Sequence, residues 1–413
     1  MKRPLLLLFL LGLSTQCRRD EVTTLTFAVG KDPIGYHQTL VAQFESAHPH
    51  IRVRLIEMPE SSTQQHNSYV TYLSSRDPSI DIYSIDITWP SEFGAAGWLL
   101  PLDTFFVEEE LDHFLPGPVE GCRWGGNLFA VPWFTDAGIL YYRKDLLERE
   151  NLSPPKTWKE LTERAERLQA RHGLYGFVFQ AQQYEGLICN FLEYLWANHG
   201  RVLDEDGTLL IDSPESVQAL TFMRDLIHRL RVAPEGVTIH KEEDSRQIFT
   251  EGRAAFMRNW PYAWALAQSE EKGSKVAGKV GICPLPHPQN GVPAACLGGW
   301  NLAVSRFSEH PSEAVQFIKF LTSYEVQKEF AVEGGRLPTR KRLYEDEEVL
   351  GECPHYRDLY EAFISARPRP VTPYYSKLSD ILQIEIHQAL IGTKIPHEAL
   401  RSAKTKIEEF LSK

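Results

Sequence analysis

Leu25-Thr-Phe-Ala-Val29 and Ile51-Arg-Val-Arg-Leu-Ile56 are two predicted strands, and a predicted helix at His37–Ala47 separates them. In the second strand apolar residues alternate with arginines, which is the two-residue period of a strand with one buried face. A further helix is predicted over Asn67–Ser75 and a further strand over Asp81–Ile85. Strands and helices that alternate in this way predict an α/β fold, in which helices pack on both sides of a parallel-type sheet.

The middle of the chain repeats this alternation as a second α/β unit. Thr157 and Glu160 have the spacing of a capping box, and the helix that they begin is predicted to end before Gly173. A strand over Tyr175–Phe179 and a helix over Tyr184–His199 follow. A single hydrophobic core stops growing at roughly 250 to 300 residues, so a chain of this length is expected to form two lobes.

Composition and charge exclude several classes of protein. The 413 residues are 43% hydrophobic and 24% charged, which is typical of a globular protein and not of a disordered chain. The net charge of -11 and the lack of a clustered basic stretch argue against nucleic acid as a partner. Mean hydropathy is -0.30 and the only long apolar run is at the N-terminus, so a polytopic membrane protein is excluded.

The N-terminus has the pattern of an export signal. Met1-Lys-Arg3 is followed by an apolar run over Leu5–Leu13 and then by Cys17, which resembles a bacterial lipoprotein processing site. We expect residues 1–16 to be a signal peptide and residues 17–21 a tether that the acylated Cys17 anchors to the outer face of the cytoplasmic membrane. Gln16 replaces the usual small residue, so a plain secretory signal remains the alternative.

The other five cysteines are widely spaced and contain no C-x-x-C pair. Neither a metal site nor a cofactor is expected from them, and most should be buried as small apolar side chains, although one disulfide remains possible. These cysteines are Cys122, Cys189, Cys283, Cys296 and Cys353.

Aromatic residues recur beside loop-forming residues near the ends of predicted strands, where α/β sheets bind ligands. An aromatic face can hold the C–H patches of a pyranose while polar side chains bind its hydroxyls. The alternative is that these rings belong to the cores. The clusters are Ile87-Thr-Trp-Pro90, Pro132-Trp-Phe-Thr-Asp136, Asn259-Trp-Pro-Tyr262 and Gly298-Gly-Trp-Asn301.

Four segments, in order along the chain, resemble the family 1 extracellular solute-binding proteins of bacterial ABC importers, and most closely the trehalose/maltose-binding branch. They are Val131-Pro-Trp-Phe-Thr-Asp-Ala-Gly-Ile-Leu-Tyr-Tyr-Arg-Lys-Asp-Leu-Leu147, Pro154-Pro-Lys-Thr-Trp158, Phe249-Thr-Glu-Gly-Arg-Ala-Ala-Phe-Met-Arg-Asn-Trp-Pro-Tyr262 and Gly298-Gly-Trp-Asn-Leu-Ala-Val-Ser305.

The resemblance implies a two-lobed periplasmic-binding-protein type II fold, with a ligand cleft between the lobes and hinge closure on binding. Three hinge crossings are expected, near Trp133–Asp136, Ala295–Gly299 and Gly335–Arg342. Lobe one is then residues 22–134 plus 300–336, and lobe two is residues 135–299 plus 337–413.

The resemblance also assigns ligand-binding roles. Asp86 and Asp136 are expected to accept hydrogen bonds from sugar hydroxyls, although an aspartate at a strand end often caps the next helix instead. Stacking is expected from the aromatic residues, close backbone approach from the glycine, and a fork of donors from the arginine. These residues are Trp260, Tyr262, Gly299, Trp300 and Arg369.

Weaker candidates for ligand contact are Asp32, Gln64, Gln65, Trp89, Tyr184 and Arg367. In the trehalose/maltose branch the segment around Gln64 carries an arginine and the first loop carries an acidic ligand-binding residue. This chain has Gln64-Gln65 and Lys31-Asp-Pro33 at those places. The departures leave the identity of the sugar open.

The implied function is that of a monomeric, exported lipoprotein that captures a disaccharide such as trehalose or maltose and delivers it to an ABC permease. A glycerophosphodiester or another polar solute is the alternative ligand. A glycosidase would need two carboxylates across the scissile bond, for which Asp86 and Asp136 are the candidates. No nucleophile elbow, P-loop or H-E-x-x-H motif is present, so no enzymatic activity is expected.

Overall fold

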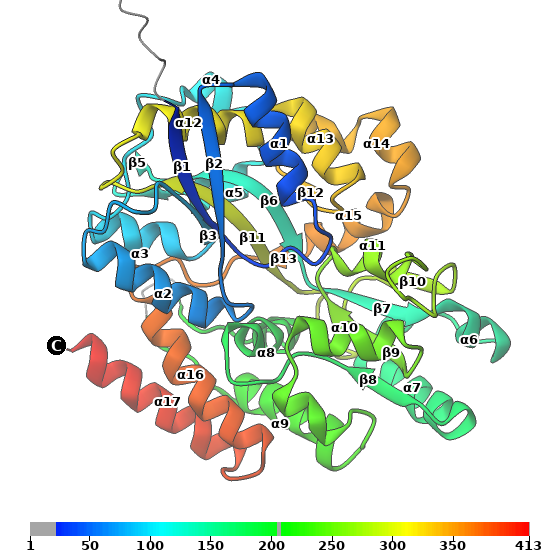
Figure 1. Cartoon of the computed structure of the whole chain (residues 1–413). Helices are drawn as coiled ribbons and strands as arrows, with labels where there is room; N and C mark the ends of the chain where they lie inside the picture. The colour runs from blue at the N-terminus through cyan, green and yellow to red at the C-terminus, as the bar shows by residue number, and fades with distance from the viewer. Residues whose placement is uncertain (1–21, 205–207, 413) are drawn as a thin grey trace, which may run out of the picture.

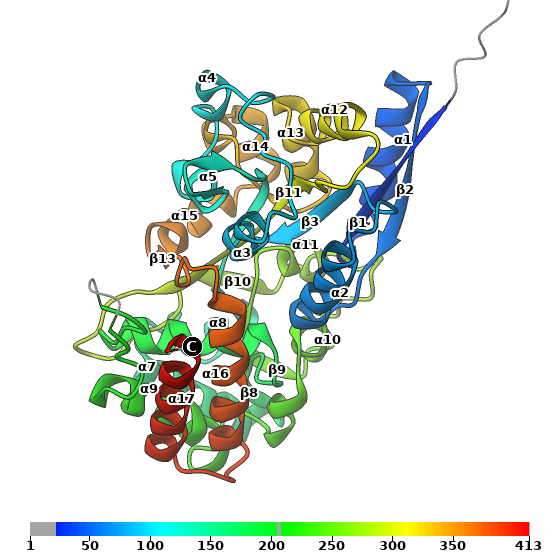
Figure 2. The same cartoon turned by 90° about the vertical axis from the view of Figure 1, so that its left-hand side faces the viewer.

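The computed structural model describes residues 22–204 and 208–412, which form a two-lobed α/β fold. Figures 1 and 2 show one lobe above the other, with the C-terminal helix at the side of the lower lobe. The predicted signal peptide at residues 1–16 and the tether at residues 17–21, including Cys17, lie outside the described residues. No described helix is both long enough and apolar enough to cross a membrane.

The upper lobe is built on a seven-stranded sheet. β1 is parallel to both β2 and β3, as the alternation predicts. β11, in contrast, is antiparallel to β3 and β6, so the expectation of a parallel sheet is wrong for the part of the upper sheet that contains β11. The strand order across the seven-stranded sheet is β12 (Leu337–Pro338), β6 (Val131–Ala137), β11 (Ala295–Val304), β3 (Ile82–Asp86), β1 (Thr23–Val29) and β2 (Ile51–Glu57), with β13 (Ala366–Arg367) beside β11.

The mixed direction has a simple cause. β6 leads the chain out of the upper lobe and β11 brings it back, so the two strands pair in opposite directions. A parallel pair would need a crossover connection of a dozen or more residues within the lobe, and these two strands are joined through the other lobe instead.

Helices cover the upper sheet. α1 has the predicted bounds, whereas α2 begins five residues before the predicted Asn67, because the Ser61 side chain caps its first turn by accepting from Gln64 N. The upper helices are α1 (His37–Ala47), α2 (Ser62–Ser74), α3 (Trp89–Ala95), α4 (Glu108–Leu111), α5 (Pro116–Gly121), α12 (Pro311–Leu321) and α13 (Tyr324–Val332); a small hairpin joins β4 (Arg123–Trp124) to β5 (Asn127–Leu128).

The lower lobe has a four-stranded sheet in the order β10 (Val280–Cys283), β7 (Ile139–Arg143), β9 (Ala254–Asn259), β8 (Tyr175–Val178). Only β8 and β9 are parallel. The predicted capping box of Thr157 and Glu160 is confirmed, and Gly173 ends that helix with φ 64°. The lower helices are α6 (Lys144–Arg149), α7 (Trp158–His172), α8 (Glu185–Ala197), α9 (Pro214–His228), η1 (Glu235–Ile239), α10 (Glu242–Thr250), α11 (Ala263–Ala267), α16 (Tyr375–Leu390) and α17 (Pro396–Leu411).

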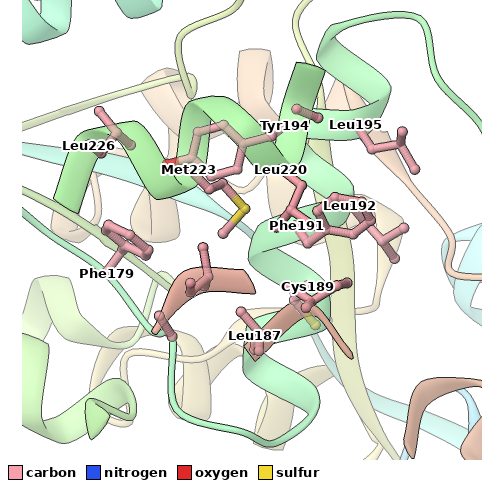
Figure 3. Close-up of a cluster of buried hydrophobic side chains, with 14 of the residues drawn as sticks. Phe179, Leu187, Cys189, Phe191, Leu192, Tyr194, Leu195, Leu220, Met223 and Leu226 are labelled. Atoms are coloured by element: carbon pink, nitrogen blue, oxygen red, sulfur yellow. The ribbon is translucent and has the colours of Figure 1, made fainter. Parts of the chain in front are cut away.

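Each lobe has its own hydrophobic core. The upper core draws on residues 25–134 and 302–330, and the lower core on residues 140–296 and 378–407. Figure 3 shows the centre of the lower core, where α8 is buried along its whole length against α9. No disulfide joins the five cysteines of the described chain, and four of these cysteines are buried, three of them in these two cores and Cys353 in a third cluster.

The lobes are joined by long strands and by one extended segment. β6 continues through Gly138 into β7, and β11 runs back beside β6. The lobe boundaries that we placed at residues 134 and 300 therefore fall within strands. The third connection follows β12, and η2 (Lys341–Tyr344), α14 (Glu347–Glu352), α15 (Tyr356–Ile364) and β13 come next along the chain before α16 begins.

Candidate ligand-binding cleft

A cavity of about 610 Å³ lies between the two lobes. Its walls come from the loop after β1, the end of β3, the middle of β6 and β11, the first turns of α8 and α10, and the end of β9. The cavity therefore opens at the carboxyl ends of β1 and β3, where open α/β sheets place ligands. Its volume lies within the range of small-molecule sites.

Ten of the thirteen candidate residues line this cavity, namely Asp32, Gln65, Asp86, Asp136, Tyr184, Trp260, Tyr262, Gly299, Trp300 and Arg369. The other three do not. Gln64 is exposed because α2 turns its neighbour Gln65 inward, and Arg367 is exposed on β13. Trp89 is buried beneath the wall, with its ring 5.6 Å from the ring of Trp300.

The indole of Trp260 is held from two directions. The guanidinium of Arg258 lies 4.0 Å from the ring centroid, and Nε1 donates to Oε1 of Glu242 at 3.2 Å. The other oxygen of Glu242 accepts from the hydroxyl of Tyr184 at 2.7 Å. Gly298 allows this arrangement, since a Cβ there would lie 3.0 Å from the indole. The ring is thus a fixed aromatic wall of the cavity.

Arg258 belongs to a buried ion pair beneath the cleft. Its Nε donates to Glu193 Oε2 at 3.0 Å, its Nη2 to Glu193 Oε1 at 2.5 Å and its Nη1 to Gln180 at 3.3 Å. Glu193 also accepts from the backbone of Cys296 on β11, and it fills the space above Gly138, where a Cβ would lie 1.9 Å from its oxygen. This pair therefore contacts both strands that connect the lobes.

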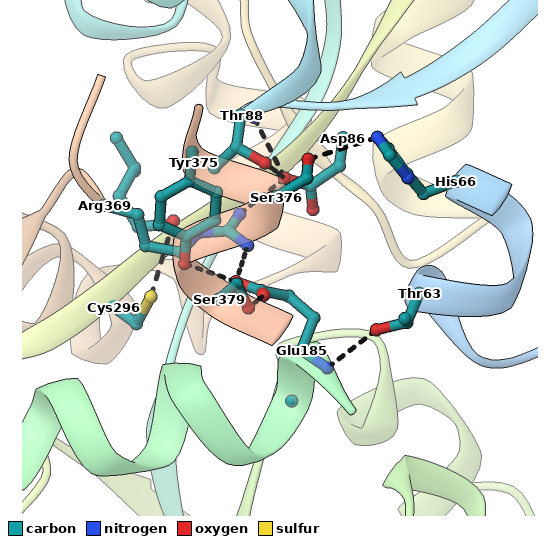
Figure 4. A network of polar contacts seen from close by, with 12 residues as sticks. Thr63, His66, Asp86, Thr88, Glu185, Cys296, Arg369, Tyr375, Ser376 and Ser379 are labelled. Atoms are coloured by element: carbon teal, nitrogen blue, oxygen red, sulfur yellow. Dashed lines mark hydrogen bonds and ion pairs between the residues drawn. The ribbon is translucent and has the colours of Figure 1, made fainter. Parts of the chain in front are cut away.

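Arg369 bridges the two lobes (Figure 4). Its Nη2 donates to Asp86 Oδ1 at 2.8 Å, and its Nη1 donates to Glu185 Oε1 at 2.8 Å. Asp86 ends β3 in the upper lobe, whereas Glu185 begins α8 in the lower lobe. Tyr375 and Ser379 also donate to Glu185. Two residues expected to bind sugar, Asp86 and Arg369, are thus bonded to each other.

Asp136, in contrast, is buried with one oxygen unpaired. The residue is 6% exposed, and Oδ1 has no hydrogen-bond partner. Burial raises the pKa of this carboxyl to about 7, with Arg336 and Arg258 acting in the opposite direction. The side chain lines the cavity, so a ligand hydroxyl could donate a hydrogen bond to this carboxyl group.

Sequence reasoning missed eight charged residues of the cavity wall, and Glu185, Glu242 and Arg336 are among them. Glu185 and Glu242 begin α8 and α10, where an acidic residue is usual and carries no sign of a ligand site. Arg336 lies at the predicted third crossing between the lobes, and this position was the one indication in the sequence that it could line the cleft.

The chain belongs to the bacterial extracellular solute-binding protein family, whose pattern matches residues 32–328. A probable ABC transporter-binding protein of Deinococcus radiodurans is 38% identical over 365 residues, which cover 86% of each chain. A mannitol-binding protein of Pseudomonas aeruginosa is 28% identical over 385 residues, which cover 90% of this chain and 86% of the relative.

Solved structures show the same two-lobed architecture. Maltose-bound MalE3 of T. maritima superposes with a TM-score of 0.91 and 44% identity, covering 94% of this chain and 100% of that chain. A solute-binding protein of Agrobacterium radiobacter in complex with ribitol has a TM-score of 0.85 and 27% identity, covering 94% of this chain and 98% of that chain.

Proposed function

We propose that this protein is the receptor of an ABC importer for a neutral saccharide or polyol, with a disaccharide such as maltose or trehalose as the first candidate. The observation that carries the proposal is the cleft itself, in which the fixed indole of Trp260 and the side chain of Asp136 both lie beside Gly298 and line the cavity. Such a site offers stacking to a sugar ring and an acceptor to its hydroxyls. The similarity to maltose-bound MalE3 supports the disaccharide.

The same proposal covers delivery and location. The receptor would capture its ligand outside the cytoplasm as a monomer, close by rotation of the lobes about the connecting strands, and dock on membrane permease subunits without catalysing a reaction. Cys17 would carry the lipid anchor, and the lobes would follow the boundaries given by the resemblance. Mass spectrometry of the exported protein tests the anchor, because an acylated N-terminal Cys17 has a characteristic mass.

Charge in the cleft favours a neutral ligand over a phosphodiester. Nine carboxylates line the cavity, against three cationic side chains, Lys31, Arg336 and Arg369. The carboxylates are Asp32, Glu57, Glu60, Asp86, Asp136, Glu185, Glu242, Glu243 and Asp244. An anionic ligand would therefore be repelled unless its charge lay against an arginine.

The test is calorimetric titration of the purified protein with maltose, trehalose, sucrose, glucose, maltotriose, mannitol, ribitol and glycerophosphocholine. We expect one saccharide or polyol to bind and to raise the melting temperature, since a ligand at a hundredfold its dissociation constant adds about 2.7 kcal/mol of stability. Binding of glycerophosphocholine alone would contradict the saccharide assignment. Release of monosaccharides from a disaccharide would indicate a glycosidase instead.

A further inference from the structure

We infer that Arg336 and Asp136 together form a ligand-binding pair that selects neutral polyhydroxy compounds, with Arg336 donating to one ligand hydroxyl and Asp136 accepting from its neighbour. The inference rests on the proposed function and adds Arg336 to the site. Both side chains line the cavity, and neither is bonded to the other. Arg336 lies between α13 and β12, whereas Asp136 lies on β6, so they approach the ligand from different connections between the lobes.

The backbone at Arg336 is fixed. Gly335 precedes it with φ 60° and passes so near α11 that a Cβ would lie 2.9 Å from the Cβ of Ala265. Arg336 N donates to Phe330 O at 3.2 Å, and its carbonyl accepts from the hydroxyl of Tyr356 at 3.3 Å. The guanidinium is therefore presented from a rigid base and is not the end of a mobile loop.

The guanidinium itself is held by rings rather than by a carboxylate. It lies 4.8 Å from the ring centroid of Phe134 in β6 and 5.2 Å from that of Tyr262 beyond β9. The residue is only 9% exposed, and its Nε has no hydrogen-bond partner. Cation–π contacts stabilise a buried guanidinium, but they leave its hydrogen-bond donors unused.

Unused donors and acceptors in a buried site are costly unless a ligand satisfies them. Arg336 Nε and Asp136 Oδ1 are such a donor and acceptor, and both side chains line one cavity. Neighbouring hydroxyls of a sugar or polyol match them, because each hydroxyl can donate or accept. A phosphate would suit Arg336 but would face Asp136, and an ammonium group would suit Asp136 but would face Arg336.

The test compares Arg336→Met with the matched control Arg340→Met. Arg340 also lies over a ring, 3.9 Å from the centroid of Phe114, but its Nε donates to Thr322 O and it does not line the cavity. Calorimetry with maltose and mannitol should show about 10- to 100-fold weaker binding for Arg336→Met, the loss of a hydrogen bond to a charged group. Arg340→Met should stay within about twofold of the wild type.

Melting of the ligand-free proteins separates ligand binding from a structural role. Arg336→Met should not lower the melting temperature, because it removes a buried charge that has no ion-pair partner. Arg340→Met should lower the melting temperature, because it removes the hydrogen bond from Arg340 to the backbone of Thr322. If Arg336→Met does not fold, Arg336→Gln provides the same comparison, with binding at least about 10-fold weaker expected.

The titrations distinguish failure of the inference about Arg336 from failure of the proposed function. Wild-type affinity in the Arg336 variant, for a saccharide or polyol that the wild type binds, would overturn the inference and leave the proposed function standing. If Arg336→Met lost binding of glycerophosphocholine but kept binding of saccharides, the inference that the pair selects neutral ligands would be overturned. If the wild type binds none of the saccharides or polyols, the proposed function fails, and the inference fails with it.

Discussion

Arg258 and Arg336 are both buried arginines near the cleft, and their surroundings differ sharply. Arg258 lies below the cleft and donates to Glu193 twice and to Gln180 once. Arg336 lies in the cleft wall, touches two aromatic rings and has an unpartnered Nε. The fold satisfies the first arginine by itself, whereas the second lines the cavity and has an Nε without a hydrogen-bond partner.

This difference separates structural charges from ligand-binding charges. A buried ion pair is tolerated when its geometry is good and its remaining atoms are bonded, as at Arg258. An unsatisfied charge in a cavity has no such compensation, so the missing partner is expected to come from the ligand. The unpaired oxygen of Asp136 follows the same rule as Arg336.

The largest effect is expected at the satisfied pair. Glu193→Ala would leave Arg258 buried and without its carboxylate, so the free energy of unfolding should fall by about 3 to 5 kcal/mol. Urea unfolding followed by circular dichroism measures this change. The control Glu163→Ala, which removes an exposed pair with Lys159, should change stability by less than about 0.5 kcal/mol. A loss below about 1 kcal/mol at Glu193 would show that the pair is not structural.

The next effect concerns the aromatic wall. Trp260→Ala should weaken binding of maltose or of whichever saccharide binds by about 2 kcal/mol, roughly 30-fold, because it removes the stacking surface. Calorimetric titration measures the dissociation constant. Trp264→Ala is the matched control, since Trp264 stacks on His355 at 4.7 Å and does not line the cavity. Equal losses in the two variants would contradict a specific role for Trp260.

An effect of comparable size should appear in the pH dependence of stability. Burial raises the pKa of Asp136 from 3.8 to about 7, so between these values the folded protein binds more protons than the unfolded chain. The contribution of Asp136 to the free energy of unfolding therefore falls as pH rises through this window. Relative to Asp136→Asn, the wild type should lose about 2 to 3 kcal/mol between about pH 5 and about pH 8 in denaturant unfolding. Parallel pH profiles for the two proteins would contradict a buried, titrating Asp136.

The smallest effect is expected at Arg367, a candidate from the sequence that the fold leaves exposed on β13. Arg367→Ala should keep both stability and ligand affinity close to those of the wild type, within about 0.5 kcal/mol. Melting and titration of this variant check the statement. A tenfold loss of affinity would mean that the exposed arginine, and not a buried one, contacts the ligand.

The sequence predicted much of the fold because periodicity and helix-terminal residues are local signals. α1 has the predicted bounds, and the capping box of Thr157 is present. The start of α2 was missed, since its first turn is a polar run whose cap, Ser61, precedes no apolar pattern. The antiparallel placement of β11 was also missed, because it depends on how the lobes are connected rather than on any local pattern.

The site was predicted only in part. Aromatic residues beside turns pointed to Trp260, Tyr262 and Trp300, which line the cavity. Burial of a charge, however, depends on tertiary packing. The sequence therefore did not indicate that Arg369 bonds Asp86 and Glu185, or that Arg336 lies between two rings.

The crystal structure of the protein with the saccharide or polyol that binds most tightly tests the account most directly. We predict that a ligand ring will lie on the indole of Trp260, with one hydroxyl bonded to the carboxyl group of Asp136 and an adjacent one bonded to the guanidinium of Arg336. A ligand bound outside the cavity between the lobes, or one that leaves Asp136 and Arg336 without new partners, would contradict it.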